Sequence, residues 1–147
     1  MEQLSPDQWR LRGANAPGYN YGEDERRTVA QIALHTANQH LVQMAIVRAI
    51  VEGRSEPLQG LPTNEEAAGN PDPEPAEVLR RLRENGAVAA AAILDLAEAE
   101  LDRALTFRGF TMTAAQAVEQ LQTGHVRWHR TSIQATVTTA AKGDGAR

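Results

Sequence analysis

Apolar residues recur every three or four positions through three long segments of this chain. The segments run from about residue 25 to 52, from about 76 to 105 and from about 113 to 140. This spacing places apolar side chains on one face of an α-helix, whereas a half-buried strand would show strict alternation. Runs of β-branched residues are scarce. The pattern therefore predicts an all-α fold with three long helices.

Local signals at the segment ends support these boundaries. Gly53 follows the first segment and is typical of a helix C-terminus. Thr113 and Gln116 have the spacing of a capping box at the start of the third segment. Ser5 followed by Pro6 predicts one further, short helix near the N-terminus. Residues 13–22, between this short helix and the first long one, are dense in turn residues and predict a loop.

The connections between the helices constrain their directions. Residues 54–75 are rich in Pro, Gly, Asn and Glu and predict a long crossover loop, which at about 22 residues can span roughly 70 Å. The first long helix is only about 40 Å long, so the second can start again from the same end and run parallel to it. A short turn at 108–109 makes the third antiparallel. We expect an up, down, down, up bundle with an abbreviated first helix, and a disordered tail over 142–147.

Composition and charge narrow the class of protein. The chain has 147 residues and a mass of 16.0 kDa, which fits a single domain over 1–147. The net charge of −4 argues against a general nucleic-acid binder, and the basic run 80–83 is typical of a solvated helix face. There is no cysteine, no signal-peptide pattern and no apolar run long enough for a membrane span. We expect a soluble cytoplasmic protein that contacts neither nucleic acid nor membrane.

The four histidines are the main functional signal. His125 and His129 are four residues apart, so on one helix they share a face with Cβ atoms roughly 6 Å apart. His35 lies on an apolar stripe of a different helix. His40 is five residues further on and points about 140° away from His35, so both cannot easily serve one ion. The spacing predicts a metal site on His35, His125 and His129.

Three imidazoles with an open fourth position suit a divalent metal, with zinc as the default and nickel or iron(II) as alternatives. The competing interpretation is structural, because a single buried histidine is usually satisfied by a carbonyl or carboxylate. Burying two imidazoles together without a shared partner is unfavourable, which favours the metal.

Other side chains have weaker signals. Trp128 lies between the paired histidines and could line a substrate pocket or belong to the ordinary core. Four acidic residues of the second long segment are candidates for supporting the histidines or acting as general bases, although each is more simply explained as helix surface: Asp95, Glu98, Glu100 and Asp102.

Two of these motifs resemble a known family. Residues 29–38, VAQIALHTAN, are similar to the second helix of the DinB/YfiT-like superfamily, in which an apolar stretch leads to a metal-binding histidine. Residues 124–133, GHVRWHRTSI, resemble that family's last helix with its H-x3-H pair. The resemblance covers about residues 4–52 and 86–140. It implies a four-helix bundle with a divalent metal on His35, His125 and His129.

The resemblance also implies a range of activities. The superfamily includes metal-dependent transferases that use low-molecular-weight thiols, proposed hydrolases, and mycothiol-dependent maleylpyruvate isomerases. The isomerases usually have Glu where this chain has His125, so that activity is not expected. We expect a zinc-dependent transferase acting on a small-molecule substrate with an external thiol, since the chain has no cysteine. The alternatives are a metal-dependent hydrolase and a non-catalytic helical binding or dimerisation module with structural histidines.

The abbreviated first helix has a consequence for assembly. Family members normally have a long first helix, of which only the final turns near residues 4–10 are represented here. Its absence leaves a groove, and residues 87–97 are apolar around much of the second long helix. Exposed apolar surface of that extent generally marks an interface, so we expect a homodimer, with a closed three-helix bundle as the alternative.

Overall fold

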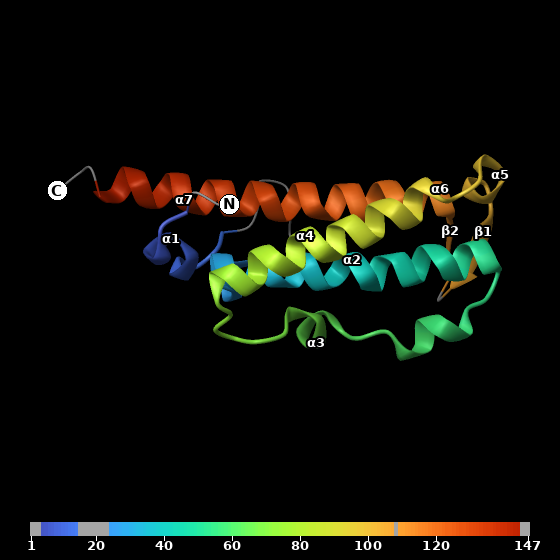
Figure 1. Cartoon of the computed structure of the whole chain (residues 1–147), viewed down its shortest axis with the longest axis horizontal. Helices are drawn as coiled ribbons and strands as arrows, with labels where there is room; N and C mark the ends of the chain where they lie inside the picture. Colours follow the sequence, from blue (N-terminus) through green and yellow to red (C-terminus); the bar gives the residue numbers. More distant parts are fainter. Residues whose placement is uncertain (1–3, 15–23, 108, 145–147) are drawn as a thin grey trace.

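The protein is a bundle of three long helices in the computed structural model, which describes residues 4–14, 24–107 and 109–144. The helices are α2 (Val29–Glu52), α4 (Pro75–Leu94) and α7 (His125–Asp144). In Figure 1, α2 and α4 run in the same direction and α7 returns beside them. The all-α class and the parallel course of the first two long helices are therefore confirmed. Most of the loop predicted over 13–22 lies outside the described residues.

The first helix is short, as the sequence predicts. Helix α1 (Pro6–Arg10) has five residues and begins at a capping box. The hydroxyl of Ser5 accepts from the backbone N–H of Gln8, and the Gln8 side chain accepts from the N–H of Ser5. Trp9 is buried and packs this stub against the start of α2.

Helix α2 begins four residues later than predicted. Thr28 is its N-cap and forms a second capping box with Gln31. The residues just before it form the short 3-10 helix η1 (Asp24–Arg26). The prediction of a start near residue 25 was wrong. Apolar periodicity does not show which residue caps the first backbone N–H groups of the helix, and that residue determines where the helix begins. At the other end Gly53 has a φ of 67°, a left-handed cap that ends the helix as predicted.

The crossover connection contains more regular structure than the sequence suggests. It includes the 3-10 helix η2 (Glu56–Gly60) and the short helix α3 (Asn64–Ala68). The side-chain amide of Asn38 on α2 donates to the carbonyl of Ala67, with a nitrogen–oxygen distance of 2.8 Å. Leu58 and Ala67 are buried, so the connection is packed along α2.

The second long helix is shorter than predicted. Helix α4 ends at Leu94 and is followed by the short helix α5 (Glu98–Leu101) and a two-stranded antiparallel hairpin, β1 (Ala104–Phe107) and β2 (Phe110–Thr113). The prediction of one helix to residue 105 was wrong. Thr and Phe residues on both sides of Gly109, which has a φ of 82°, favour a hairpin over a helix.

The third long segment begins at its predicted capping box but changes helix type. Helix α6 (Ala114–Ala117) starts from Thr113, whose hydroxyl accepts from the backbone of Gln116. It continues as the seven-residue π-helical segment η3 (Val118–Gly124) and then as α7. Such wider turns often occur at functional sites. Helix α7 extends to Asp144, beyond the end expected near residue 140.

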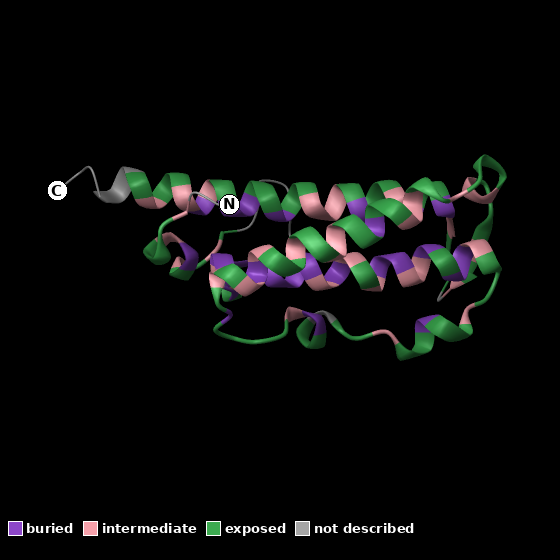
Figure 2. Cartoon of the chain, in the orientation of Figure 1, coloured by how far each residue is buried: buried purple, intermediate pink, exposed green. Residues whose placement is uncertain are grey.

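The core is divided into two apolar clusters along α2, which carries more buried residues than any other element (Figure 2). One cluster, near α1, includes Trp9, Ile32 and Ile133. The other, towards the hairpin, includes Met44 and Val47. Between them α2 buries polar side chains, namely His35, Thr36, Gln39 and Gln43. The functional candidates therefore lie in a polar belt between two apolar clusters.

No helix in the described ranges combines the length and apolar character that a membrane crossing requires.

Candidate metal centre

The structure brings His35, His125 and His129 together between α2 and the start of α7. Each offers a ring nitrogen, and the three nitrogens lie within 4.8 Å of one another. The ring centroids are 5.3 Å apart for His35 and His125, 5.1 Å for His35 and His129, and 4.3 Å for His125 and His129. These three histidines could hold one metal ion.

Asp24 orients the most deeply buried part of the cluster. Its Oδ2 lies 3.0 Å from Nδ1 of His129, and both side chains are almost completely buried. An ionised carboxylate only accepts hydrogen bonds, so Nδ1 of His129 donates to Asp24 and Nε2 is the ring nitrogen that faces the cluster. Nε2 of His129 lies 3.0 Å from Nε2 of His125. Two imidazole nitrogens bound to one tetrahedral zinc lie about 3.3 Å apart, so the spacing fits a shared ion.

Electrostatics keep the imidazoles in the form that binds metals. Burial lowers the pKa of His35 to about 3, and the charges of Arg27 and His129 act in the same direction. Burial and the neighbouring histidines lower the pKa of His125 to about 3. Neutral imidazole is the metal-ligating form, so neither ring needs to lose a proton near neutral pH.

Unpartnered buried nitrogens provide the test of whether the residues fit a metal. Nδ1 of His35 and Nδ1 of His125 are buried and make no hydrogen bond within the described parts of the chain. A buried polar atom without a partner is unfavourable and calls for an explanation. A cation shared by the three rings can take Nδ1 of His35 as a ligand, whereas it would take His125 through Nε2 and leave Nδ1 of His125 without a partner. The donor set and its spacing therefore fit a divalent metal.

Asp24 was missed by the sequence analysis. Burial opposes ionisation of its carboxyl, but the hydrogen bond and charge of His129, with Ser132 and Arg27, hold its pKa below the usual value. A carboxylate behind a ligating histidine fixes the ring and raises its basicity. No spacing rule points to Asp24, because it lies 105 residues from His129. It is one of three acidic residues in the run 23–25, and nothing in that run distinguishes it.

The acidic residues considered for the same role have other surroundings. Asp95 is the C-cap of α4, and Glu98 and Asp102 are exposed around α5. Glu100 accepts a hydrogen bond from the backbone N–H of Ala97 and so caps α5. The interpretation of these four as helix surface was the better one.

His40 lies outside the three-histidine cluster. Its Nδ1 is 2.8 Å from Oε1 of Gln122, and the Gln122 amide donates in return to the carbonyl of His40 at 2.9 Å. This reciprocal pair joins α2 to η3, one turn before His125. Within the described residues, His40 therefore connects α2 to η3 through hydrogen bonds with Gln122.

Trp128 belongs to neither the core nor a described cavity. Its side chain is 47% exposed on α7, between the two paired histidines. Three cavities among the described residues are lined by other side chains. The interpretation of Trp128 as ordinary core was wrong, and a place for it at the mouth of the site stays a prediction.

Comparison with known proteins agrees with the geometry. A sequence model of the DinB superfamily matches residues 1–133, which include all three histidines and Asp24. Neither the curated proteins nor the solved structures gave a match to this chain. Because the match covers most of the 147 residues, the chain belongs to the DinB superfamily.

Proposed function

We propose that this protein is a metal-dependent transferase that joins an external low-molecular-weight thiol to an electrophilic small molecule, with His35, His125 and His129 as the metal ligands. The observation that carries the proposal is the convergence of three imidazoles on one point, with Asp24 hydrogen-bonded to one of them. A divalent cation there, with zinc as the default, would act as a Lewis acid on a coordinated group.

The chain's own residues define what the site can do. His35 and His129 are each only 1% exposed, whereas His125 is partly exposed. Reactants would therefore approach past His125, and the two buried rings would exclude water from the other side. The thiol must come from solution because the chain contains no cysteine. A hydrolase needs a base that activates water, whereas a transferase that uses a thiol does not. Asp24 is the carboxylate whose charge influences His35 and His125, and it is already hydrogen-bonded to His129. The site therefore suits a transferase better than a hydrolase.

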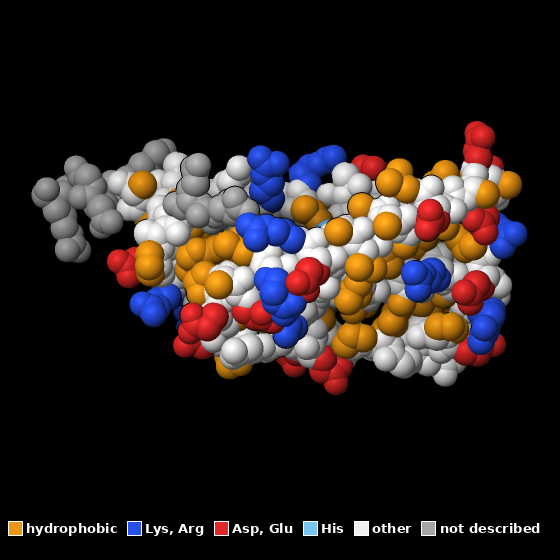
Figure 3. Space-filling model, viewed as in Figure 1, with side chains coloured by type: hydrophobic (Ala, Val, Ile, Leu, Met, Phe, Trp, Pro, Cys, Tyr) orange, Lys and Arg blue, Asp and Glu red, His pale blue; other side chains and the backbone are white. Residues whose placement is uncertain are grey.

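The assembly proposed with this function is a homodimer. Helix α4 exposes apolar side chains, including Leu94 at 84% and Val88 at 53% exposure, and Val88 lines a groove together with side chains of α2. Figure 3 shows hydrophobic side chains gathered over α4 and α2 on this face. A two-fold pairing of this face with its copy would cover it.

Metal content tests the site first. Protein prepared without a histidine tag should carry close to one divalent metal per chain by elemental analysis. His125→Ala and His129→Ala should each remove most of it, whereas His40→Ala removes no ligand and should keep most of it, although the loss of its contact with Gln122 lowers the affinity. Full occupancy in the His125→Ala/His129→Ala double variant would reject the ligand assignment.

Activity tests the reaction class next. Metal-loaded protein should conjugate a small thiol such as glutathione or cysteine to 1-chloro-2,4-dinitrobenzene, and chelation should abolish the rate. An ester substrate in the same buffer without thiol serves as the comparison. Metal-dependent ester hydrolysis without any thiol conjugation would reject the transferase in favour of the hydrolase.

A further inference from the structure

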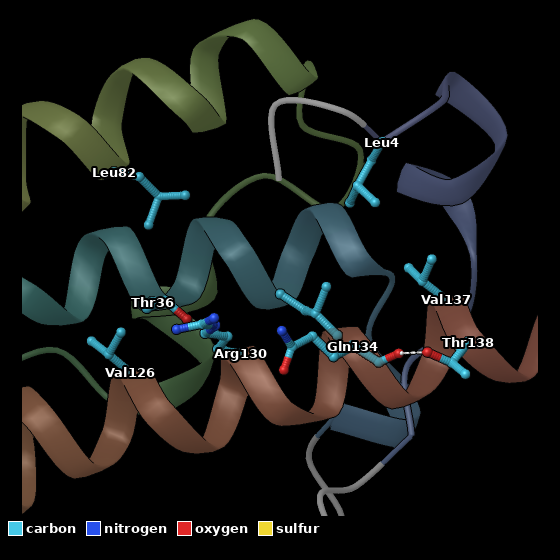
Figure 4. A pocket seen from close by; sticks show the side chains of 9 residues that line it. Leu4, Thr36, Leu82, Val126, Arg130, Gln134, Val137 and Thr138 are labelled. Carbon is cyan, nitrogen blue, oxygen red and sulfur yellow. Dashed lines mark hydrogen bonds between the residues drawn. The ribbon is translucent and has the colours of Figure 1, made fainter.

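A cavity of about 520 Å³ lies beside the histidine cluster, between α2, α4 and α7. Figure 4 shows Leu82 reaching into it from α4, Leu4 from the N-terminal segment, and Val126, Arg130 and Val137 from α7. The volume lies within the usual range for small-molecule sites. Three helices and residue Leu4 therefore line a partly open space that can accept a small molecule.

The wall of the cavity combines apolar and polar side chains. Leu4, Leu82, Val126, Ile133 and Val137 provide the apolar part. The remaining lining side chains are Thr36, Arg130, Gln134 and Thr138. The hydroxyls of Thr36 and Thr138 donate to backbone carbonyls of their own helices. Arg130 and the Gln134 amide are therefore the side chains that offer N–H donors to a ligand.

The charge of this lining is unbalanced. Arg130 is its one charged residue, and no carboxylate lies among the residues that line the cavity. Over the described ranges Arg130 takes part in no ion pair, whereas the exposed Arg80 and Arg81 on α4 are both paired with Glu77. A guanidinium presents parallel N–H groups that match a carboxylate in a two-point hydrogen bond. The lining therefore complements an anion attached to an apolar body.

The cavity and the histidines share two helices without sharing residues. Thr36, Val126 and Arg130 each directly follow a histidine of the cluster in the sequence. One residue turns an α-helix by about 100°, so these side chains line the neighbouring side of the same helices. A molecule in the cavity would lie next to the cluster, and its binding would not require the metal.

We propose that this cavity binds a small amphipathic carboxylate, with the carboxylate on Arg130 and an aliphatic or aromatic body against the apolar wall. The proposal goes beyond the metal-dependent transferase and does not depend on it, because none of the three histidines lines the cavity. It assigns an anionic, apolar class of ligand to a specific position on α7.

Calorimetric titration with octanoate tests the proposal, with octylamine as the cationic counterpart of the same length. The wild-type protein should bind octanoate in a one-to-one complex and should bind octylamine at least tenfold more weakly. Arg130→Gln should weaken octanoate binding at least tenfold. Arg127→Gln, an exposed arginine on the same helix outside the lining, is the matched control and should bind like wild type.

Two further measurements make each outcome decisive. Thr138→Trp places a large side chain at an exposed lining position and should also weaken binding, while circular dichroism reports whether each variant is folded. Binding should persist in chelator and in His125→Ala, which separates this site from the metal centre. The proposal is overturned if wild type does not bind octanoate, if Arg130→Gln binds as well as wild type, if Arg127→Gln loses as much, or if octylamine binds equally.

Discussion

Nδ1 of His129 donates a hydrogen bond to Oδ2 of Asp24 over 3.0 Å, in a part of the protein where neither side chain reaches solvent. The pair connects η1 to α7, and it leaves Nε2 of His129 facing Nε2 of His125. Asp24, which fixes the orientation of the His129 ring, therefore comes from the short 3-10 helix η1 just before α2 and not from one of the long helices.

Removing the charge of Asp24 should weaken metal binding. Asp24→Asn keeps the size of the side chain but no longer stabilises the His129 ring with the proton on Nδ1, so zinc affinity should fall about 10- to 100-fold. Competition titration against a zinc-binding dye measures this. Asp95→Asn, on an exposed acidic residue at the end of α4, is the matched control. Equal zinc affinity in Asp24→Asn and wild type would contradict the role given to Asp24.

Acid should destabilise the metal-free protein through His35 and His125. Both have a folded-state pKa of about 3 against a usual value of 6.5, so the unfolded chain takes up their protons first as pH falls. Their contribution is fully present above about pH 6.5 and is lost between there and about pH 3. The slope is at most about 1.4 kcal/mol per pH unit for each ring.

Urea unfolding in chelator between pH 7.5 and 4.5 measures this dependence. His125→Gln removes one of the two titrating rings and should lower the slope of unfolding free energy against pH. His40→Gln is the comparison, because the His40 ring lies outside the cluster. Identical slopes in wild type and His125→Gln would show that the buried ring does not control acid stability.

The sequence was sufficient for part of this site. The spacing of four between His125 and His129 determines that they share a face wherever the segment is helical, and the apolar stripe around His35 determines that it points inward. The long connection over 54–75 was enough to predict that α2 and α4 run parallel.

Other features depend on tertiary contacts that no local pattern contains. The Asp24–His129 hydrogen bond requires η1 to lie against α7, which depends on how α1 and α2 pack. No residue pattern predicts the π-helical segment η3. Its only glycine is the last of its seven residues and does not mark where the helix type changes. The hairpin was predictable from Gly109 and its Thr and Phe neighbours, but the preceding helical periodicity masked it.

The His40–Gln122 pair should hold η3 in the register that directs His125 at the cluster. Gln122→Ala removes both of its hydrogen bonds to His40 and leaves Nδ1 of the partly buried His40 ring without its partner. We expect about 1–3 kcal/mol lower unfolding free energy and weaker zinc binding. Gln120→Ala, at an exposed position of the same segment, is the control. Reduced stability with zinc affinity unchanged would limit the pair to a structural role.

Self-association should depend on the exposed apolar side of α4. Leu94 and Val88 have large exposed fractions, and the residues between them are alanines and an isoleucine, so two copies of α4 can approach closely. Light scattering at low micromolar concentration should give about twice the 16.0 kDa of one chain. Val88→Glu/Leu94→Glu should shift the mass to a monomer, because burying two carboxylates in each copy is strongly unfavourable.

Phe110→Glu changes a similarly exposed hydrophobic residue on the hairpin and should leave the dimer intact. A wild-type mass near 16.0 kDa would reject the dimer, and dissociation by Phe110→Glu alone would move the interface from α4 to the hairpin.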